Sequence, residues 1–135
     1  IDLYKNLYQN ITFHFEQSEI PAFPVDKGGI KRVLINLISN SVKAIDSMQG
    51  TISIHTTYDK SKGAGIIEFG DTGNGIPDED KGRIFDPYFT KDKDGMGLGL
   101  AIVHSIVLDH HGKIYVEDNI PHGAKFVIEL PIIEA

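Results

Sequence analysis

Three polar residues, Asn36, Asn40 and Lys43, are spaced so that they share one side of a helix. At about 100° per residue their side chains fall within roughly 60° of one another, at the edge of an apolar stripe centred near Leu37 and Ser41. An amide oxygen is a hard ligand suited to Mg²⁺, which takes its other ligands from water and phosphate groups, and a lysine there can meet an anion. Asparagines one turn apart are also common as solvated or capping residues, so this pattern alone leaves both interpretations open.

A second candidate is the segment DTGNGIP at residues 71–77, which places one carboxylate directly after an apolar stretch. Gly73 and Gly75 allow the backbone to turn tightly or to approach a ligand closely. The Asp71 carboxylate could accept a hydrogen bond from an exocyclic amine, although Asp-x-Gly also occurs in ordinary turns. A calcium loop is excluded, because position twelve counted from Asp71 is Gly82, where such a loop needs a glutamate.

Glycines alternate in a third segment, DGMGLGLA at residues 94–101, and a helical pattern follows at once. Free N–H groups at a helix N-terminus, with no side chains in the way, form an anion site. The segment is not a Walker A loop, because no Lys-Ser or Lys-Thr follows the glycines. It is not a dinucleotide fingerprint either, because Leu100 stands where the third glycine belongs and no strand precedes it. A phosphate cradle and a flexible glycine-rich connector both remain possible.

Aromatic residues precede those glycines in the segment RIFDPYFTK at residues 83–91. Together with Lys91 they could form a lid that closes over a ligand and neutralises its charge. The alternative is that Phe85 and Phe89 only pack in the core, which we expect of at least one of them.

Hydrophobic periodicity predicts the elements that must position these segments. Residues 70–99 contain seven glycines and two prolines, so we expect mostly loop there, with one short helix at 78–84, and a loop of this length in a small domain is usually functional. The other elements add up to helices packed on one mixed or antiparallel sheet. We expect helices at 2–10, 26–48 and 98–110 and strands at 11–16, 51–56, 66–69, 113–117 and 124–130, with turns at 59–65 and 119–123.

Composition narrows the class of protein. The chain has 135 residues, enough for one domain with a single core. Thirteen Lys and Arg against nineteen Asp and Glu give a net charge of −6, which disfavours nucleic acid as a partner. The absence of cysteine excludes disulfides and thiolate metal sites. Because no apolar run is long enough to span a membrane, we expect the chain itself to be soluble. Because it begins at Ile1 and not at Met, we expect residues 1–135 to be one domain excised from a longer protein.

Taken in this order and at these separations, the four segments resemble the catalytic ATP-binding domain of sensor histidine kinases, in the GHKL superfamily shared with gyrase B, MutL and the heat-shock chaperone ATPases. The resemblance covers about residues 11–130, and residues 40–44 and 85–91 are most similar to the nitrogen-regulation subgroup. It implies the Bergerat fold, a two-layer α/β sandwich with helices packed on one face of a mixed, mostly antiparallel sheet.

The resemblance also implies a role for each candidate residue, with ATP and Mg²⁺ as cofactors. Asn40 is then the Mg²⁺ ligand and Asn36 the other asparagine of the catalytic box, while Lys43 approaches the phosphates. Asp71 accepts the adenine amino group, which predicts selectivity for adenine over guanine. The other implied nucleotide-binding residues form the purine pocket, the lid and the phosphate cradle: Gly73, Gly75, Ile76, Tyr88, Phe89, Thr90, Lys91, Gly95, Met96, Gly97, Leu98, Gly99 and Leu100.

One departure separates classes within that superfamily. Hydrolysing members carry a glutamate where this chain has Asn36, and an amide cannot serve as a general base. We therefore expect slow hydrolysis and transfer of the γ-phosphoryl group to a histidine. The alternatives are a stand-alone ATPase, a serine kinase acting on an anti-sigma-factor partner, and a non-catalytic interaction module.

The acceptor histidine of such kinases lies in an upstream dimerisation domain and is usually followed by an acidic residue. None of the six histidines here is followed by one. His104, in the helix after the glycines, either approaches the phosphates or has a surface role. We therefore expect that this fragment does not autophosphorylate alone. We also expect it to be cytoplasmic and monomeric. The resemblance implies a homodimeric parent whose downstream partner is a response regulator.

Overall fold

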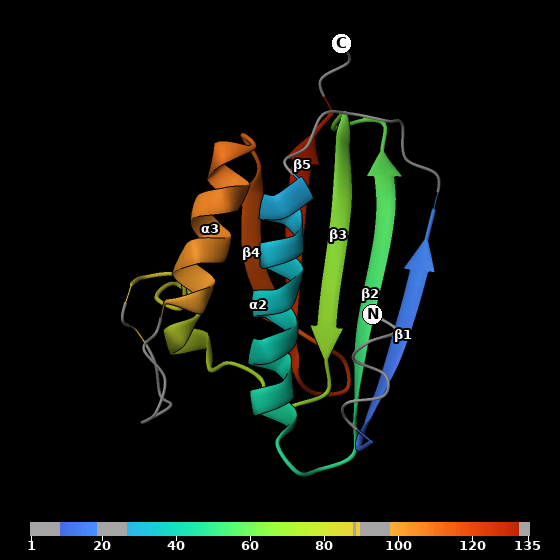
Figure 1. Cartoon of the computed structure of the whole chain (residues 1–135), viewed down its shortest axis with the longest axis vertical. Coiled ribbons are helices and arrows are strands. Elements are labelled where there is room, and N and C mark those ends of the chain that lie inside the picture. Colours follow the sequence, from blue (N-terminus) through green and yellow to red (C-terminus); the bar gives the residue numbers. More distant parts are fainter. Residues whose placement is uncertain (1–8, 19–26, 88, 90–97, 133–135) are drawn as a thin grey trace.

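The computed structural model describes residues 9–18, 27–87, 89 and 98–132. Two helices cover one face of a five-stranded sheet, so the molecule has two layers (Figure 1). The predicted α/β sandwich is therefore confirmed. The elements in chain order are β1 (Ile11–Gln17), α2 (Lys27–Ile45), β2 (Gly50–Asp59), β3 (Ala64–Asp71), the 3₁₀ turn η1 (Asp78–Asp80), α3 (Gly99–Asp109), β4 (Lys113–Asp118) and β5 (Ala124–Pro131).

The sheet is mixed and mostly antiparallel, as expected. Its strand order is β1-β2-β3-β5-β4, with β1 parallel to β2 and every other neighbouring pair antiparallel. The register places Phe69 of β3 between Ile54 of β2 and Phe126 of β5. These three residues point to the same face, because residues that pair directly across a sheet share a face.

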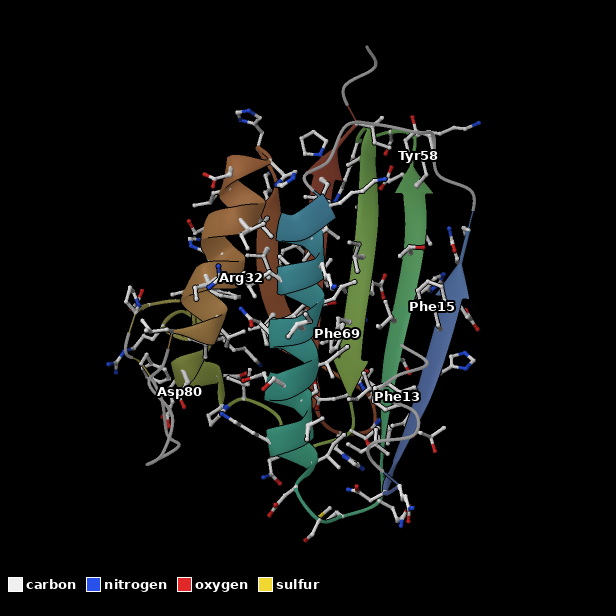
Figure 2. All side chains as sticks on the ribbon, in the orientation of Figure 1. Phe13, Phe15, Arg32, Tyr58, Phe69 and Asp80 are labelled. Carbon is white, nitrogen blue, oxygen red and sulfur yellow. The ribbon has the colours of Figure 1, made fainter. Side chains whose placement is uncertain are left out.

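The core lies between that face and the helices. Phe69 sits behind α2 (Figure 2) and, like Phe126 and Leu37, is completely buried. Val33, Leu37, Ser41 and Ile45 recur at four-residue steps along α2 and are buried, so the predicted amphipathic helix is confirmed. Within the described residues no helix covers the opposite face of the sheet, and no helix there is long and apolar enough to cross a membrane.

Several predicted boundaries are wrong at the ends of elements. The helix predicted to reach residue 48 ends at Ile45, since Asp46 adopts a left-handed conformation with φ 56°. The Asn10 side chain donates hydrogen bonds of 2.9 Å to the carbonyls of Asp46 and Met48, which stabilises the turn in place of another helical turn. Met48 is consequently 58% exposed, and β2 already begins at Gly50, beside Ile11.

The other differences are smaller. The short helix predicted at 78–84 is a 3₁₀ turn at Asp78–Asp80 followed by irregular turns, and β3 is longer than the predicted 66–69. The second long helix spans 99–109 rather than 98–110, because Leu98 and His110 are its caps. The predicted helix at 2–10 and Asp26, the first residue of the predicted long helix, lie largely or wholly outside the described residues.

Candidate nucleotide site

The candidate site is at one end of the molecule, where β3 ends beside the C-terminal part of α2, the turn between β4 and β5, and the first turn of α3 (Figure 1). Asp71 is the last residue of β3 and is 1% exposed. A buried carboxylate is costly unless donors surround it, so its partners indicate what the site can still accept.

The two oxygens of the Asp71 carboxylate are held differently. Oδ1 accepts hydrogen bonds from the backbone N–H of Gly73 at 2.9 Å and of Ala124 at 3.4 Å. Oδ2 accepts one from the hydroxyl of Ser41 at 2.9 Å. An ionised carboxylate offers about four acceptor positions, so these three donors leave one position on Oδ2 for a ligand. An amine could donate to this position, and the role of Asp71 as its acceptor stays a prediction.

The turn between β4 and β5 holds the backbone of Asp71. The side-chain amide of Asn119 donates to the Asp71 carbonyl at 2.6 Å. Gly123 has φ 108°, and a Cβ at this position would lie 1.9 Å from the same carbonyl oxygen. Only glycine fits there without displacing one of the two segments.

The two glycines after Asp71 are also closely packed, against other segments of the backbone. A Cβ on Gly73 would lie 2.7 Å from the backbone of Ala44, and Gly75 has φ 77° and faces the carbonyl of Gly123. The backbone N–H of Asn74 donates to the Ala44 carbonyl at 3.2 Å. The loop is thus attached to the end of α2, with Ile76 partly buried against the core.

Asn36 and Asn40 lie one turn apart on α2, at the second part of the site. Both are half-buried, and the Asn36 side-chain nitrogen donates to the carbonyl of Gly99 at 3.2 Å. Gly99 opens α3, whose N-cap Leu98 makes no side-chain hydrogen bond to the first turn. The N–H groups of that turn, including Leu100, have no intrahelical acceptor and so can bind an anion. Lys43, exposed, lies a further turn along α2.

These residues suit a hydrated magnesium ion that bridges protein and phosphate. The Asn40 amide oxygen is a hard donor, half-buried next to an asparagine that is bonded to the start of α3. Within the described part of the chain no three His, Cys, Asp or Glu residues cluster to hold a metal.

The aromatic segment packs as part of the core. Phe85 stacks on His104 with ring centroids 5.5 Å apart and contacts the edge of Phe126 at 6.2 Å. The guanidinium of Arg83 lies 4.8 Å from the ring centroid of Phe89. Both phenylalanines pack against the buried core, so the packing interpretation holds for both. His104 contributes to this packing by stacking on Phe85.

Six of the predicted nucleotide-binding residues lie outside the described residues. They are Tyr88, Thr90 and Lys91 of the predicted lid and Gly95, Met96 and Gly97 of the predicted phosphate cradle. Their roles remain predictions.

Sequence analysis missed two side chains that hold Asp71. Ser41 was assigned only to the apolar stripe of α2, although a hydroxyl in the centre of such a stripe signals a buried polar partner. Asn119 was assigned only to a turn, and no local pattern indicates that its amide reaches β3. Gly123 was missed for the same reason.

A hollow of about 630 Å³ lies on the other, uncovered face of the sheet. Several of the charges that line it are paired. Lys62 and the Tyr115 hydroxyl both contact Glu129 at 3.2 Å, and Glu68 and Glu117 lie on either side of Lys125. The hydrogen bond from Lys62 to Glu129 raises the pKa of the lysine. The pKa of Tyr115 is raised mainly by burial, and further by its hydrogen bond to the Glu129 carboxylate. This hollow contains none of the predicted nucleotide-binding residues.

Comparison with known proteins agrees with this geometry. The family model for histidine kinase-, DNA gyrase B-, and HSP90-like ATPases matches residues 25–134. The chain belongs to this family. It is 40% identical over 114 residues to the sensor histidine kinase ZraS of Escherichia coli O157:H7, covering 84% of this chain and 24% of ZraS. Sensor histidine kinases among its relatives favour this class over the chaperone-type ATPases and anti-sigma-factor kinases.

Solved structures give the same result. The catalytic domain of histidine kinase ThkA superposes with a TM-score of 0.84 at 35% identity, covering 97% of this chain and 86% of that domain. A structure of ThkA in complex with the response regulator protein TrrA aligns with a TM-score of 0.79 at 32% identity, covering 98% of this chain and 38% of the ThkA chain. The similarity to the ThkA catalytic domain thus extends over nearly all of this chain.

Proposed function

We propose that this histidine-kinase-type ATPase domain binds Mg²⁺-ATP and, within its parent protein, donates the γ-phosphoryl group to a histidine of a separate dimerisation domain. The observation that carries this proposal is the buried Asp71 carboxylate. Its three protein donors leave one acceptor position of Oδ2 for a ligand, beside a loop of closely packed glycines. The half-buried asparagines of α2 and the first turn of α3 lie at the same end of the molecule.

The open position on Asp71 favours adenine. Adenine presents an exocyclic amine, which donates a hydrogen bond to the carboxylate. Guanine presents a carbonyl oxygen at the corresponding ring position, which would face the carboxylate as a second acceptor. A hydrogen bond to a charged group contributes about 1.5–3 kcal/mol, enough for strong discrimination between the two bases.

The asparagines and α3 would hold the phosphates. Mg²⁺, when bound, would neutralise phosphate charge and orient the γ-phosphoryl group. Asn40 would supply the amide oxygen for the metal, and Lys43 would approach the phosphates. The unpaired N–H groups at the start of α3, together with the predicted cradle Gly95 to Leu100, would bind phosphate oxygens.

Asn36 favours transfer over hydrolysis. Its side-chain nitrogen is bonded to the Gly99 carbonyl, and an amide does not take a proton from water. In the proposed reaction a histidine nitrogen attacks the γ-phosphorus, a P–N bond forms, the bond to the β–γ bridging oxygen breaks, and ADP leaves. The protein's contribution is position and charge.

Other domains and partners of the parent are part of this proposal. The chain spans 24% of the length of ZraS, and none of its histidines is followed by an acidic residue. These facts support an acceptor histidine elsewhere in the parent. We further propose that the parent is a homodimer and that this domain lies in the cytoplasm. The complex of ThkA with TrrA supports a response regulator as the next phosphoryl acceptor.

Calorimetric titration tests the proposal. The chain is titrated with a non-hydrolysable ATP analogue and with the corresponding GTP analogue, each with and without Mg²⁺. We expect saturable binding of the ATP analogue that is tighter with Mg²⁺ and at least tenfold tighter than binding of the GTP analogue. Equal affinity for the two bases, or no binding by the folded chain, would contradict it.

A second experiment tests the phosphoryl acceptor. The chain is mixed with the separately produced dimerisation domain of its parent and with γ-labelled ATP. We expect label on the dimerisation domain in an acid-labile, base-stable linkage, as a phosphohistidine gives, and none on the chain alone. Acid-stable label would indicate a serine or threonine acceptor instead.

A further inference from the structure

Ser41 is a polar residue in an apolar position. It is 0% exposed and occupies the buried face of α2, one turn after Leu37 and one turn before Ile45, which are also buried. A hydroxyl in such surroundings destabilises the fold unless it is hydrogen-bonded. Its partner is the Oδ2 atom of Asp71, at 2.9 Å across the core.

This hydrogen bond makes the two oxygens of Asp71 unequal. Oδ1 has both of its acceptor positions occupied by the backbone N–H groups of Gly73 and Ala124. Oδ2 has one position occupied by Ser41 and one open. A base amino group can therefore bind only Oδ2 without displacing a protein donor.

The backbone of Asp71 does not depend on Ser41. Asn119 donates to the Asp71 carbonyl at 2.6 Å, and the register with Ile52 on β2 holds the strand end. The freedom that remains is rotation of the carboxylate about its last bond. The backbone donors limit that rotation at Oδ1, and Ser41 of α2 limits it at Oδ2.

We propose that Ser41 is a positioning residue for base selection, whose hydroxyl orients the Asp71 carboxylate so that the open position of Oδ2 faces the exocyclic amine of the nucleotide. This inference rests on the proposed function and adds the residue that sets its specificity. Ser41 directly follows Asn40, so consecutive residues of α2 would serve the base and the metal. Removing the hydroxyl should weaken base selection without touching the metal ligand.

Calorimetry with two nucleotides separates this role from a structural one. Wild type and Ser41→Ala are titrated with Mg²⁺-ATP and with Mg²⁺-purine riboside triphosphate, which carries hydrogen in place of the amino group. We expect Ser41→Ala to lose about tenfold in ATP affinity, equivalent to about 1.4 kcal/mol, and to bind the purine riboside nucleotide within about twofold of wild type. Ser39→Ala, an exposed serine on the same helix, is the matched control and should change neither.

The outcomes are distinct. An equal loss for both nucleotides, or no loss for ATP, would overturn the role of Ser41 while leaving the proposed function standing. Failure of the wild type to prefer ATP would overturn both. Ser41→Cys keeps the side-chain size with a weaker donor, so it should show intermediate preference for ATP. Ser41→Cys also tests the proposal if Ser41→Ala proves less stable than wild type. A preference for ATP in Ser41→Cys equal to that of wild type would contradict the proposal.

Discussion

The two ends of the candidate nucleotide site are built differently. At the base end, Asp71 is buried and held by donors from α2, from its own loop and from the start of β5, and Asn119 holds its carbonyl. At the phosphate end, half-buried Asn36 donates a hydrogen bond to the Gly99 carbonyl, and Lys43 is exposed. The base end is thus part of the core, whereas the phosphate end lies where two helices meet at the surface.

This difference has a consequence for substitutions. A base is rigid and is recognised by a few fixed atoms, so its site gains from being continuous with the core. Phosphates and a hydrated ion tolerate adjustment of the groups that bind them. Changes at the base end should therefore affect folding and binding together, while changes at the phosphate end should affect binding alone.

The largest effect is expected for Gly123→Ala. The new Cβ would lie 1.9 Å from the Asp71 carbonyl oxygen, at φ 108°, so the turn must move away from β3. We expect a loss of roughly 3 kcal/mol or more in the free energy of unfolding, measured with urea, together with loss of nucleotide binding.

Two other glycines provide matched controls for that substitution. Gly63 has a positive φ of 61°, and a Cβ added there would meet no atom within 4 Å. Gly63→Ala should therefore lower the free energy of unfolding by about 1 kcal/mol, through backbone strain alone. Gly82→Ala meets no atom within 4 Å and should be nearly neutral. A stability loss in Gly123→Ala no greater than that in Gly63→Ala would contradict the close packing of the base end.

Asp71→Asn should have the next largest effect, on affinity. The amide retains one acceptor oxygen but adds donors that face the N–H of Gly73 or the hydroxyl of Ser41. We expect affinity for the ATP analogue to fall about 10- to 150-fold by calorimetry, with the secondary structure unchanged. Asp109→Asn, at an exposed position of α3, is the control, and unchanged affinity in Asp71→Asn would refute the assignment of this carboxylate.

Asn40→Ala tests the phosphate end. We expect the variant to lose the Mg²⁺-dependent part of its nucleotide affinity, about tenfold. Its free energy of unfolding should stay within about 0.5 kcal/mol of that of wild type, because Asn40 is only half-buried. Affinity is measured with and without Mg²⁺. Equal gain from Mg²⁺ in variant and wild type would exclude Asn40 as a metal ligand, and a large loss of stability would contradict the contrast between the two ends.

The smallest effect is expected at the rim of the base end, where Lys81 contacts both Asp78 of η1 and Asp118 of β4. The hydrogen bond from Lys81 lowers the pKa of Asp78 from its ordinary value of 3.8. The stability that this pair contributes is therefore present above pH 3.8, and it is lost as the pH falls through the lowered pKa of the folded state. Lys81→Met should therefore unfold at a slightly lower temperature than wild type at pH 7, and the two midpoints should converge below about pH 3.8.

Lys60→Met supplies the comparison, since Lys60 is exposed in the turn between β2 and β3. It should show no such pH-dependent difference. A difference between wild type and Lys81→Met that persists in acid would mean that packing of the lysine chain, and not its charge, ties η1 to β4.

Local pattern was sufficient for much of the fold and of the site. The apolar steps of α2 and the alternation of residues 51–56 in β2 predicted which faces are buried, because both periods follow from backbone geometry. The glycines after Asp71 predicted a tight turn or a close approach to a ligand. The structure shows Gly73 and Gly75 packed against other backbone, and the approach to a ligand stays a prediction. Element ends were predicted less well, because Asn10 ends α2 from far along the chain.

The sequence by itself therefore determined which residue types serve the site and which elements carry them, since both are encoded over short distances along the chain. Only the tertiary structure decided that Ser41, Asn119 and the backbone of Ala124 converge on Asp71. These donors come from 30 to 53 residues away. Their meeting depends on strand order, on register and on where α2 crosses the sheet, which result from packing the whole core at once.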